Sequence, residues 1–193
     1  AVLVNARIRK RYLRGGLSIA SIGPQSDLSY PYEYLGDQAS LLKEILDTTH
    51  SFATKLKTAK RPIIIVGQGA LNRRDGHHIL RLCQEIAEKF NMIQADWNGF
   101  NVLHTAAARV GALDLGFVPQ NGGLDLQGIL SGCQHGQIKV AYLLGVDEIA
   151  AAQYGDAFTI YQGHHGDAGA HRANVILPGA TFVEKTATYV NTE

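Results

Sequence analysis

The sequence has 193 residues, of which 46% are hydrophobic, 18% are charged and 21 are glycine. This length fits one domain, or one domain and part of a second. Disordered chains and coiled coils need far more charged residues, so the composition excludes both classes and indicates a folded chain whose surface is short of charge. The net charge of +1 gives no overall field that would attract nucleic acid or anionic lipid.

The apolar runs and the cysteines exclude further classes of protein. The longest apolar runs, Ile63–Val66 and Val140–Val146, are far shorter than the roughly 18 residues of a membrane span and have the length of buried strands. Cys83 and Cys133 suit a reducing compartment and are too few for an iron–sulfur cluster, which takes four ligands. The first residues, Ala1–Lys10, do not match a signal peptide, and we expect the chain to be part of a longer protein.

Strand and helix patterns alternate in the first half of the chain. Apolar runs that end at glycine or proline predict strands over Leu17–Ile22 and Ile63–Val66, the second buried on both faces. Helical spacing of apolar residues predicts helices over Gln38–Asp47, Phe52–Ala59 and 75–90. In the last of these, Asp75 is the expected N-cap. Its apolar face is formed by Ile79, Cys83, Ile86 and Phe90.

The second half repeats the pattern. We expect a short helix over Leu126–Leu130 and strands over Val140–Leu144, Phe158–Tyr161 and Asn174–Leu177, the first of these strands being of the buried type. Strand, glycine turn and helix in this order predict an α/β fold with a mostly parallel sheet, flanking helices and right-handed crossovers. We expect a single domain over residues 1–193, with a less regular segment at about 96–133.

One loop is the best candidate for a site. Gly163, His164, His165 and Asp167 follow a predicted strand, and open α/β sheets bind their ligands where strands end. Histidine and carboxylate could hold a metal, but neighbouring residues in an extended chain point to opposite faces, so His164 and His165 would not face one ion. The alternative is a turn held by hydrogen bonds, in which Gly163, Gly166 and Gly169 adopt positive φ.

Two other sequence patterns are weaker candidates for a functional site. Gly67-Gln68-Gly69 follows a predicted strand but has Asn72 where a dinucleotide-binding fingerprint needs its third glycine, so a plain tight turn is the better interpretation. A basic run near the start is interpreted as a helix face that is solvated or paired with carboxylates. Its members are Arg7, Arg9, Lys10, Arg11 and Arg14.

Specific strings carry a family resemblance. The run Ile160–Ala170, followed by Asn174–Ala180, Glu184-Lys185 and Ala187–Glu193, closely resembles the large iron–sulfur subunit of respiratory complex I, called the 75 kDa subunit in mitochondria and the G subunit in bacteria. Further similar strings occur in order along the chain: Asn5–Lys10, Asp27-Leu28, Leu35–Asp37, Ala59-Lys60 and Ala112–Gly116.

The resemblance implies a domain like that of the molybdopterin oxidoreductases, with Rossmann-like layers, which has lost its cofactor and acts as a scaffold. The pattern of those enzymes is matched by Leu177-Pro178, Glu184, Thr188, Asn191 and Glu193. Ala187 stands where they have glycine, which weakens the case for a bound pterin. Ala170-His171-Arg172 departs from the relatives as well.

The resemblance also implies where the chemistry takes place. The 2Fe-2S and 4Fe-4S clusters that carry electrons from NADH to quinone belong to an amino-terminal part outside these residues. This segment then has no catalytic residue, cofactor or metal. Its partners would be other subunits of the hydrophilic arm, peripheral on the inner membrane, on the cytoplasmic side in a bacterium or the matrix side in a mitochondrion.

Two alternatives remain from the sequence. A working molybdopterin- or nucleotide-binding oxidoreductase domain would explain Gly67–Gly69 and the pattern from Glu184 to Glu193. The middle domain of a thiamine-diphosphate enzyme resembles Lys60–Ala70 alone, a length at which strand-turn patterns recur by chance.

Overall fold

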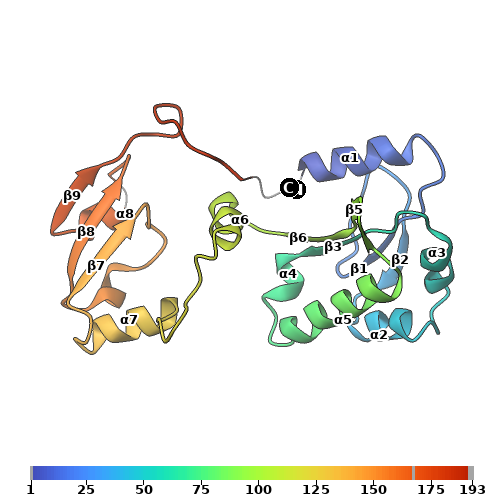
Figure 1. The fold of residues 1–193 in the computed structure, drawn as a ribbon, viewed down its shortest axis with the longest axis horizontal. Coiled ribbons are helices and arrows are strands. Elements are labelled where there is room, and N and C mark those ends of the chain that lie inside the picture. Colours follow the sequence, from blue (N-terminus) through green and yellow to red (C-terminus); the bar gives the residue numbers. More distant parts are fainter. Residues whose placement is uncertain (1, 167, 191–193) are drawn as a thin grey trace. The chain divides into compact units, whose positions relative to one another are not determined.

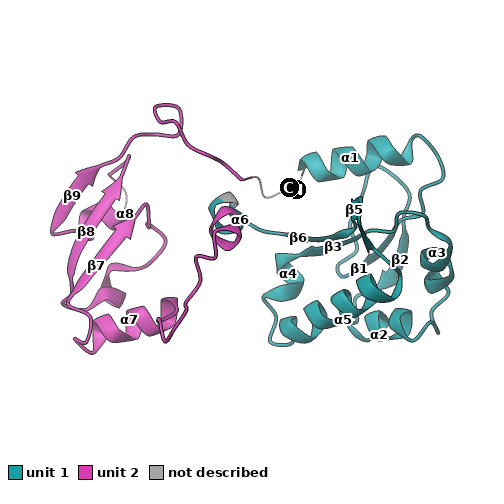
Figure 2. Ribbon diagram, viewed as in Figure 1, with its two compact units in different colours: residues 1–110, 191–193 teal, residues 111–190 magenta. Residues whose placement is uncertain are grey.

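The computed structural model describes residues 2–166 and 168–190 (Figure 1). The chain divides into two compact units, unit 1 with residues 1–110 and 191–193 and unit 2 with residues 111–190 (Figure 2). The expected single domain over residues 1–193 stays a prediction.

Unit 1 alternates helices with short strands. Its elements are α1 (Val2–Tyr12), β1 (Ala20–Ile22), β2 (Glu33–Gly36), α2 (Ser40–Leu46), α3 (Phe52–Thr58), β3 (Ile64–Gly67), α4 (Gln68–Leu71), α5 (Gly76–Lys89), β4 (Ile93–Gln94), β5 (Trp97–Asn98) and β6 (Phe100–Leu103). The strands form three pairs: β1 with β2 and β3 with β6 are parallel, and β4 with β5 is antiparallel.

Helix α5 forms the core of unit 1, as its apolar spacing predicts. Ile79, Cys83, Ile86 and Phe90 are all buried, and they pack with α2 and β3 in one cluster. Burial raises the pKa of Cys83 to about 11, so the thiol stays protonated and acts as a small apolar group.

The start of α5 differs in detail from the prediction. Asp75 occupies the N-cap position, but its side chain makes no capping hydrogen bond. Both carboxylate oxygens instead accept hydrogen bonds from the Arg73 guanidinium, at 2.8 and 3.0 Å. A two-pronged bond to a charged group is stronger than one to a backbone N–H, so the carboxylate turns away from the helix.

Unit 2 is built on a three-stranded parallel sheet in the order β7-β8-β9. Its elements are α7 (Leu126–Gln134), β7 (Val140–Leu144), a 3₁₀ helix (Ala151–Tyr154), β8 (Phe158–Gly163), α8 (Ala168–Arg172) and β9 (Val175–Pro178), and α6 (Ala107–Asp114) begins in unit 1 and ends in unit 2. A second core lies on one face of this sheet, where Leu130, Cys133 and Tyr154 pack on Leu143 and Tyr161.

The α/β class is confirmed, but the sheet arrangement is not the predicted one. Over residues 2–166 and 168–190, four small sheets are present instead of a single mostly parallel sheet. The sequence also missed β2, because Glu33–Gly36 has neither an apolar run nor a clean alternation. Segment 96–133 is partly regular, since it contains β5, β6, α6 and most of α7.

Burial of the strands is one-sided where the sequence predicted two-sided burial. In β7, Ala141 and Leu143 are buried, whereas Val140, Tyr142 and Leu144 are 56%, 52% and 69% exposed. β3 is similar: Val66 is buried and the preceding Ile63 is 46% exposed. For β7 the prediction is wrong within the described residues, because the helices of unit 2 cover only the face of Ala141 and Leu143.

Replacing a core side chain should show how far unit 1 depends on α5. Ile86 is 2% exposed, so Ile86→Ala should lower the free energy of unfolding by about 2 to 5 kcal/mol through lost burial and a residual cavity. Ile93, which is 55% exposed, provides the matched control, and Ile93→Ala should cost less than about 1 kcal/mol. Denaturant unfolding checks both, and equal losses would contradict the assigned core.

Candidate functional site

The candidate loop lies where the strands of unit 2 end. Because β7, β8 and β9 are parallel, their carboxyl ends meet at one edge of the sheet. Gly163 is the last residue of β8, and His164 and His165 follow it directly. Asp167 lies outside the described residues. The loop after β7, which contains Asp147, reaches the same edge, as the hydrogen bonds below show.

A tyrosine and a carboxylate hold this edge together. Tyr161 is 2% exposed, and its hydroxyl donates a hydrogen bond to Asp147 Oδ2 at 3.0 Å. The second oxygen, Asp147 Oδ1, accepts one from the Gly169 N–H at 2.9 Å. The Tyr161 hydroxyl also lies 3.5 Å from the His165 carbonyl oxygen. These bonds link the loops after β7 and β8 to the first turn of α8.

The glycines at this edge make room for that tyrosine. A Cβ on Gly163 would lie 2.2 Å from the Tyr161 hydroxyl, and a Cβ on Gly169 would lie 2.6 Å from its ring. Neither glycine, nor Gly166, has positive φ. The expectation of positive φ is therefore wrong for this loop, and close approach by Tyr161 explains Gly163 and Gly169 instead.

The two histidines lie against each other. Their ring centroids are 4.5 Å apart in an edge-to-face arrangement, and both residues are exposed. Opposite orientations were expected from an extended chain, but residues 164 and 165 form a bend after β8, which brings the rings together. Within residues 2–166 and 168–190, the structure gathers no group of three or more His, Cys, Asp or Glu side chains that could hold a metal.

Glu184 belongs to the same unit and is held by its own turn. Glu184 Oε2 accepts hydrogen bonds from the N–H and the hydroxyl of Thr181, both at 3.0 Å. These two bonds, the backbone one first, lower the pKa of Glu184 below its ordinary value, and the nearby charge of His164 adds to the effect. The carboxylate is thus already hydrogen-bonded within this chain.

The partial dinucleotide fingerprint forms a plain turn. Gly67 ends β3, and Gln68 starts the four-residue helix α4. A Cβ at Gly67 or Gly69 would meet no atom within 4 Å, so neither glycine is required by a close approach in this chain. Gln68 Nε2 lies 3.3 Å from His104 Nδ1, where β3 and β6 end.

Four members of the basic run, Arg7, Arg9, Lys10 and Arg11, lie on helix α1, as interpreted from the sequence, and Arg14 lies in the turn that follows the helix. The helix contains no buried residue. One side is attached to unit 1, where the Tyr30 hydroxyl donates to Asn5 Oδ1 at 2.6 Å and the Tyr12 and Tyr30 rings lie 6.2 Å apart. Of the five cations, Arg11 donates to the Gly15 carbonyl oxygen at 2.7 Å, which supports a solvated face that also closes its own helix end.

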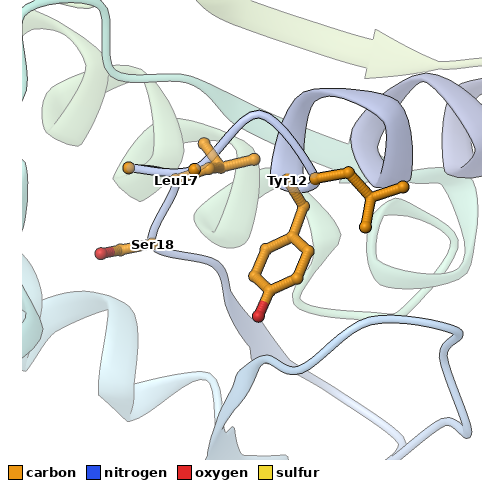
Figure 3. Close-up of a pocket in the computed structure, with 6 residues that line it drawn as sticks. Tyr12, Leu17 and Ser18 are labelled. Atoms are coloured by element: carbon orange, nitrogen blue, oxygen red, sulfur yellow. The ribbon is translucent and has the colours of Figure 1, made fainter.

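Two hollows of the structure lie away from this loop. An open depression of about 490 Å³ lies at the end of α1, and Figure 3 shows Tyr12, Leu17 and Ser18 on its wall. A second, of about 550 Å³, lies over the loop from Gln25 to Tyr34. Both belong to unit 1 and contain none of the candidate residues, so neither supports the loop at Gly163 as a ligand site.

Comparison with known proteins decides the family. The molybdopterin oxidoreductase family matches residues 1–193. This chain belongs to the molybdopterin oxidoreductase family. As a member, it is similar to the NADH-ubiquinone oxidoreductase 75 kDa subunit of Reclinomonas americana, with 46% identity over 193 residues. It is also 43% identical over 193 residues to the G subunit of the NADH-quinone oxidoreductase of Rickettsia bellii (strain RML369-C).

A plant protein is similar over the same residues. The chain is 42% identical over 194 residues to the mitochondrial NADH dehydrogenase [ubiquinone] iron-sulfur protein 1 of Solanum tuberosum. In all three comparisons the whole of this chain is covered, together with 27%, 27% and 25% of the relative. The resemblance derived from the sequence strings is confirmed, and the chain spans about a quarter of the length of these relatives.

The family name implies a molybdopterin, and the residues at the sheet edge do not fit one. The space beside Gly163 and Gly169, where a glycine could admit a cofactor, is occupied by Tyr161. The edge and its neighbouring turn carry the carboxylates of Asp147, Glu148 and Glu184, which would repel the phosphate of a pterin. As a molybdopterin oxidoreductase relative, this chain has an edge closed by its own side chains.

Removing the tyrosine hydroxyl tests this closure. Tyr161→Phe should lower the free energy of unfolding by about 1 to 3 kcal/mol, because the partly buried Asp147 carboxylate loses a donor. Tyr142 makes the matched control: its hydroxyl bonds to Gln162 on the exposed face of the same sheet, and Tyr142→Phe should change stability by less than about 0.5 kcal/mol. Thermal unfolding of the two variants measures the difference; equal effects would contradict the bonding role of Tyr161.

The turn at Glu184 should respond to acid. Its folded pKa is lowered, so the turn's stabilisation is complete above the ordinary value of 4.5 and is lost as the pH falls through the folded pKa. Carboxyl NMR of Glu184 should give a midpoint below 4.5, and Thr181→Val should raise it by removing the hydroxyl bond while keeping the backbone bond. Thr49→Val in unit 1 should leave the midpoint unchanged. A midpoint that does not move in Thr181→Val would refute the hydroxyl contribution.

Proposed function

We propose that this chain is a segment of the large iron–sulfur subunit of NADH:quinone oxidoreductase, respiratory complex I, and that it serves as a scaffold in the hydrophilic arm. The observation that carries the proposal is the match of the entire chain, at 42–46% identity, to 75 kDa and G subunits. One family covers all 193 residues, which supports treating them as a single domain of that subunit.

The chain's cysteines support a scaffold without a redox centre. Iron–sulfur clusters of either kind are held by four ligands, commonly cysteine thiolates. Cys83 and Cys133 are both buried, in the cores of units 1 and 2, and burial keeps Cys83 protonated. We place the 2Fe-2S and 4Fe-4S clusters of the full subunit, and hence electron transfer from NADH to quinone, in its amino-terminal part.

An uncovered sheet face supports the scaffold role. Helices α7 and α8 and the 3₁₀ helix cover one face of β7 and β8, but parallel sheets are normally covered on both faces. The other face has six side chains that are 39–69% exposed: Val140, Tyr142, Leu144, Phe158, Val175 and Leu177. Packing of this face by other parts of the full subunit would complete Rossmann-like layers, which we propose for the intact protein.

Partners and location follow from the proposal. The subunit would contact other subunits of the hydrophilic arm, peripheral on the inner membrane, on the cytoplasmic side in a bacterium or the matrix side in a mitochondrion. In the part of the chain that the structure describes, no helix has the length and apolarity needed to cross a membrane. The uncovered face of β7-β8-β9 is the surface that we propose for these contacts.

Purification of the full-length protein tests the main proposal. The tagged protein should copurify with NADH:quinone oxidoreductase activity and with EPR signals of two-iron and four-iron clusters, while residues 1–193 expressed alone should bind no cluster. A stoichiometric cluster in residues 1–193, or a full-length protein that purifies without partners or NADH oxidation, would refute it.

A second candidate function is a working molybdopterin oxidoreductase, which the family match favours by name. The same purified protein separates the two. A cofactor held by this chain would copurify as molybdenum or tungsten with an extracted pterin that fluoresces. The misfit at Gly163 and Gly169 predicts neither, and stoichiometric pterin would establish the second candidate instead.

Charge placed on the uncovered face should block assembly. Leu144→Asp puts a carboxylate on this apolar surface at the end of its edge strand β7, where Leu144 is 69% exposed, so burying it against a partner would be costly. We expect the incorporation of the subunit into the complex to fall at least tenfold, measured by native gel electrophoresis. Leu115→Asp, in the same unit but outside the sheet and 87% exposed, is the control and should assemble normally; equal assembly of both variants would contradict the interface.

A further inference from the structure

The chain contains two Asn-Gly pairs, Asn98-Gly99 and Asn121-Gly122, and neither has a role in the sites described above. An Asn-Gly pair is chemically labile, because the backbone nitrogen that follows the asparagine can attack the asparagine's own side-chain amide. Glycine favours this attack, since it has no Cβ beside the nitrogen and its backbone moves more freely than that of other residues. The surroundings of each pair decide whether the nitrogen can reach the amide.

The second pair lies in an exposed turn between α6 and α7. Asn121 and Gly122 have φ values of 52° and 80°, and the Gly123 N–H donates to the Gln120 carbonyl oxygen at 2.9 Å, as in a type I′ turn. Residues 113–127 are all exposed. Among the residues that the structure describes, neither the Asn121 side chain nor the Gly122 N–H has a hydrogen-bond partner. The two groups that would react are therefore not held by other parts of the chain.

The first pair is held by the fold of unit 1. Gly99 is buried, its N–H donates to the Met92 carbonyl oxygen at 2.7 Å, and its carbonyl oxygen accepts from the Ile64 N–H at 2.8 Å. Asn98 Oδ1 accepts a hydrogen bond from the Phe100 N–H at 3.0 Å. The Gly99 nitrogen can attack the Asn98 amide only after these bonds have opened.

We propose that Asn121 is a site of spontaneous deamidation in the folded protein, and that the fold protects Asn98. The backbone nitrogen of Gly122 loses its proton and bonds to Cγ of Asn121. The bond from Cγ to the side-chain nitrogen then breaks, and this nitrogen leaves as ammonia with the proton that Gly122 has lost. The product is a cyclic imide. Water opens the imide at either of its carbonyl carbons and leaves aspartate or isoaspartate at position 121.

The modification changes the charge and the backbone of the turn. Either product replaces a neutral amide with a carboxylate, which removes the net charge of +1. Isoaspartate also adds a carbon to the main chain, so the type I′ geometry is lost. The new charge lies in a loop that contains Leu115 and Phe117, which are 87% and 84% exposed. The reaction needs only this chain and water, so it does not rest on the proposed function.

Incubation of the full-length protein in mildly alkaline buffer tests the proposal, because base removes the proton from the attacking nitrogen. Peptide mapping by mass spectrometry should show aspartate and isoaspartate accumulating at position 121 at least about tenfold faster than at position 98, where several hydrogen bonds must break first. A rate at Asn98 that equals or exceeds the rate at Asn121, or no reaction at Asn121, would overturn the proposal.

Two glycine variants separate the attack from backbone strain. Gly122→Ala places a Cβ beside the attacking nitrogen and should slow the deamidation of Asn121 on the order of tenfold. Gly116→Ala is the matched control: Gly116 lies in the same loop and has a similar φ of 68°, but it does not follow an asparagine. This variant should leave the rate at Asn121 unchanged. Equal rates in the two variants would refute the attack by Gly122.

Unfolding the same protein in denaturant tests the protection of Asn98. In the unfolded chain neither glycine nitrogen is held, so both pairs should deamidate at comparable rates. Asn98 should therefore react faster after unfolding than before it. A slow reaction at Asn98 that persists without the fold would refute protection by the hydrogen bonds of Gly99.

Discussion

Parallel strands need hydrogen-bond partners at their edges and apolar cover on both faces, and this need governs both units. A parallel sheet is joined by helices that lie over it, so its strands are normally apolar on each side. In unit 2 the cover exists on the face of Leu143 and Tyr161 and is missing on the face of Tyr142 and Leu144. In unit 1 the faces toward α5 are covered, and among the residues that the structure describes no ladder joins the β1-β2 pair to the β3-β6 pair. In both units, the missing cover or strand pairing would have to come from other parts of a longer protein.

At the carboxyl edge of β7-β8-β9, side chains of the chain itself occupy the place where related sheets bind a ligand. In open α/β sheets this edge is where loops diverge and ligands bind. Here Tyr161 extends along the edge, and Asp147 binds both its hydroxyl and the first turn of α8. Glycines that would admit a cofactor instead admit the ring. A scaffold role is consistent with this arrangement, because the hydrogen bonds that fix the loops come from within the chain.

The sequence predicted elements well where one local pattern decides the outcome. Helix 75–90 was found because Ile79, Cys83, Ile86 and Phe90 recur on one face, and Val140–Leu144 was found because its apolar run has strand length. The sequence did not predict features that depend on a contact with a residue far away in the chain. Nothing local to Tyr161 reveals a carboxylate 14 residues earlier, so its role at the edge was missed and the glycines were assigned to positive φ.

The wrong prediction of two-sided burial has a different cause from the missed tyrosine. The apolar pattern of Val140–Leu144 reflects the environment in which these residues function. The exposed fractions of Val140 and Leu144 reflect only the contacts made within these 193 residues. An apolar outer face on a sheet would be a liability for an isolated domain, since large exposed apolar patches promote association. In a subunit where other segments cover that face, the same residues stabilise the assembly. The low share of charged residues, 18%, is consistent with this proposal, because surfaces that meet other parts of a protein are depleted in charge.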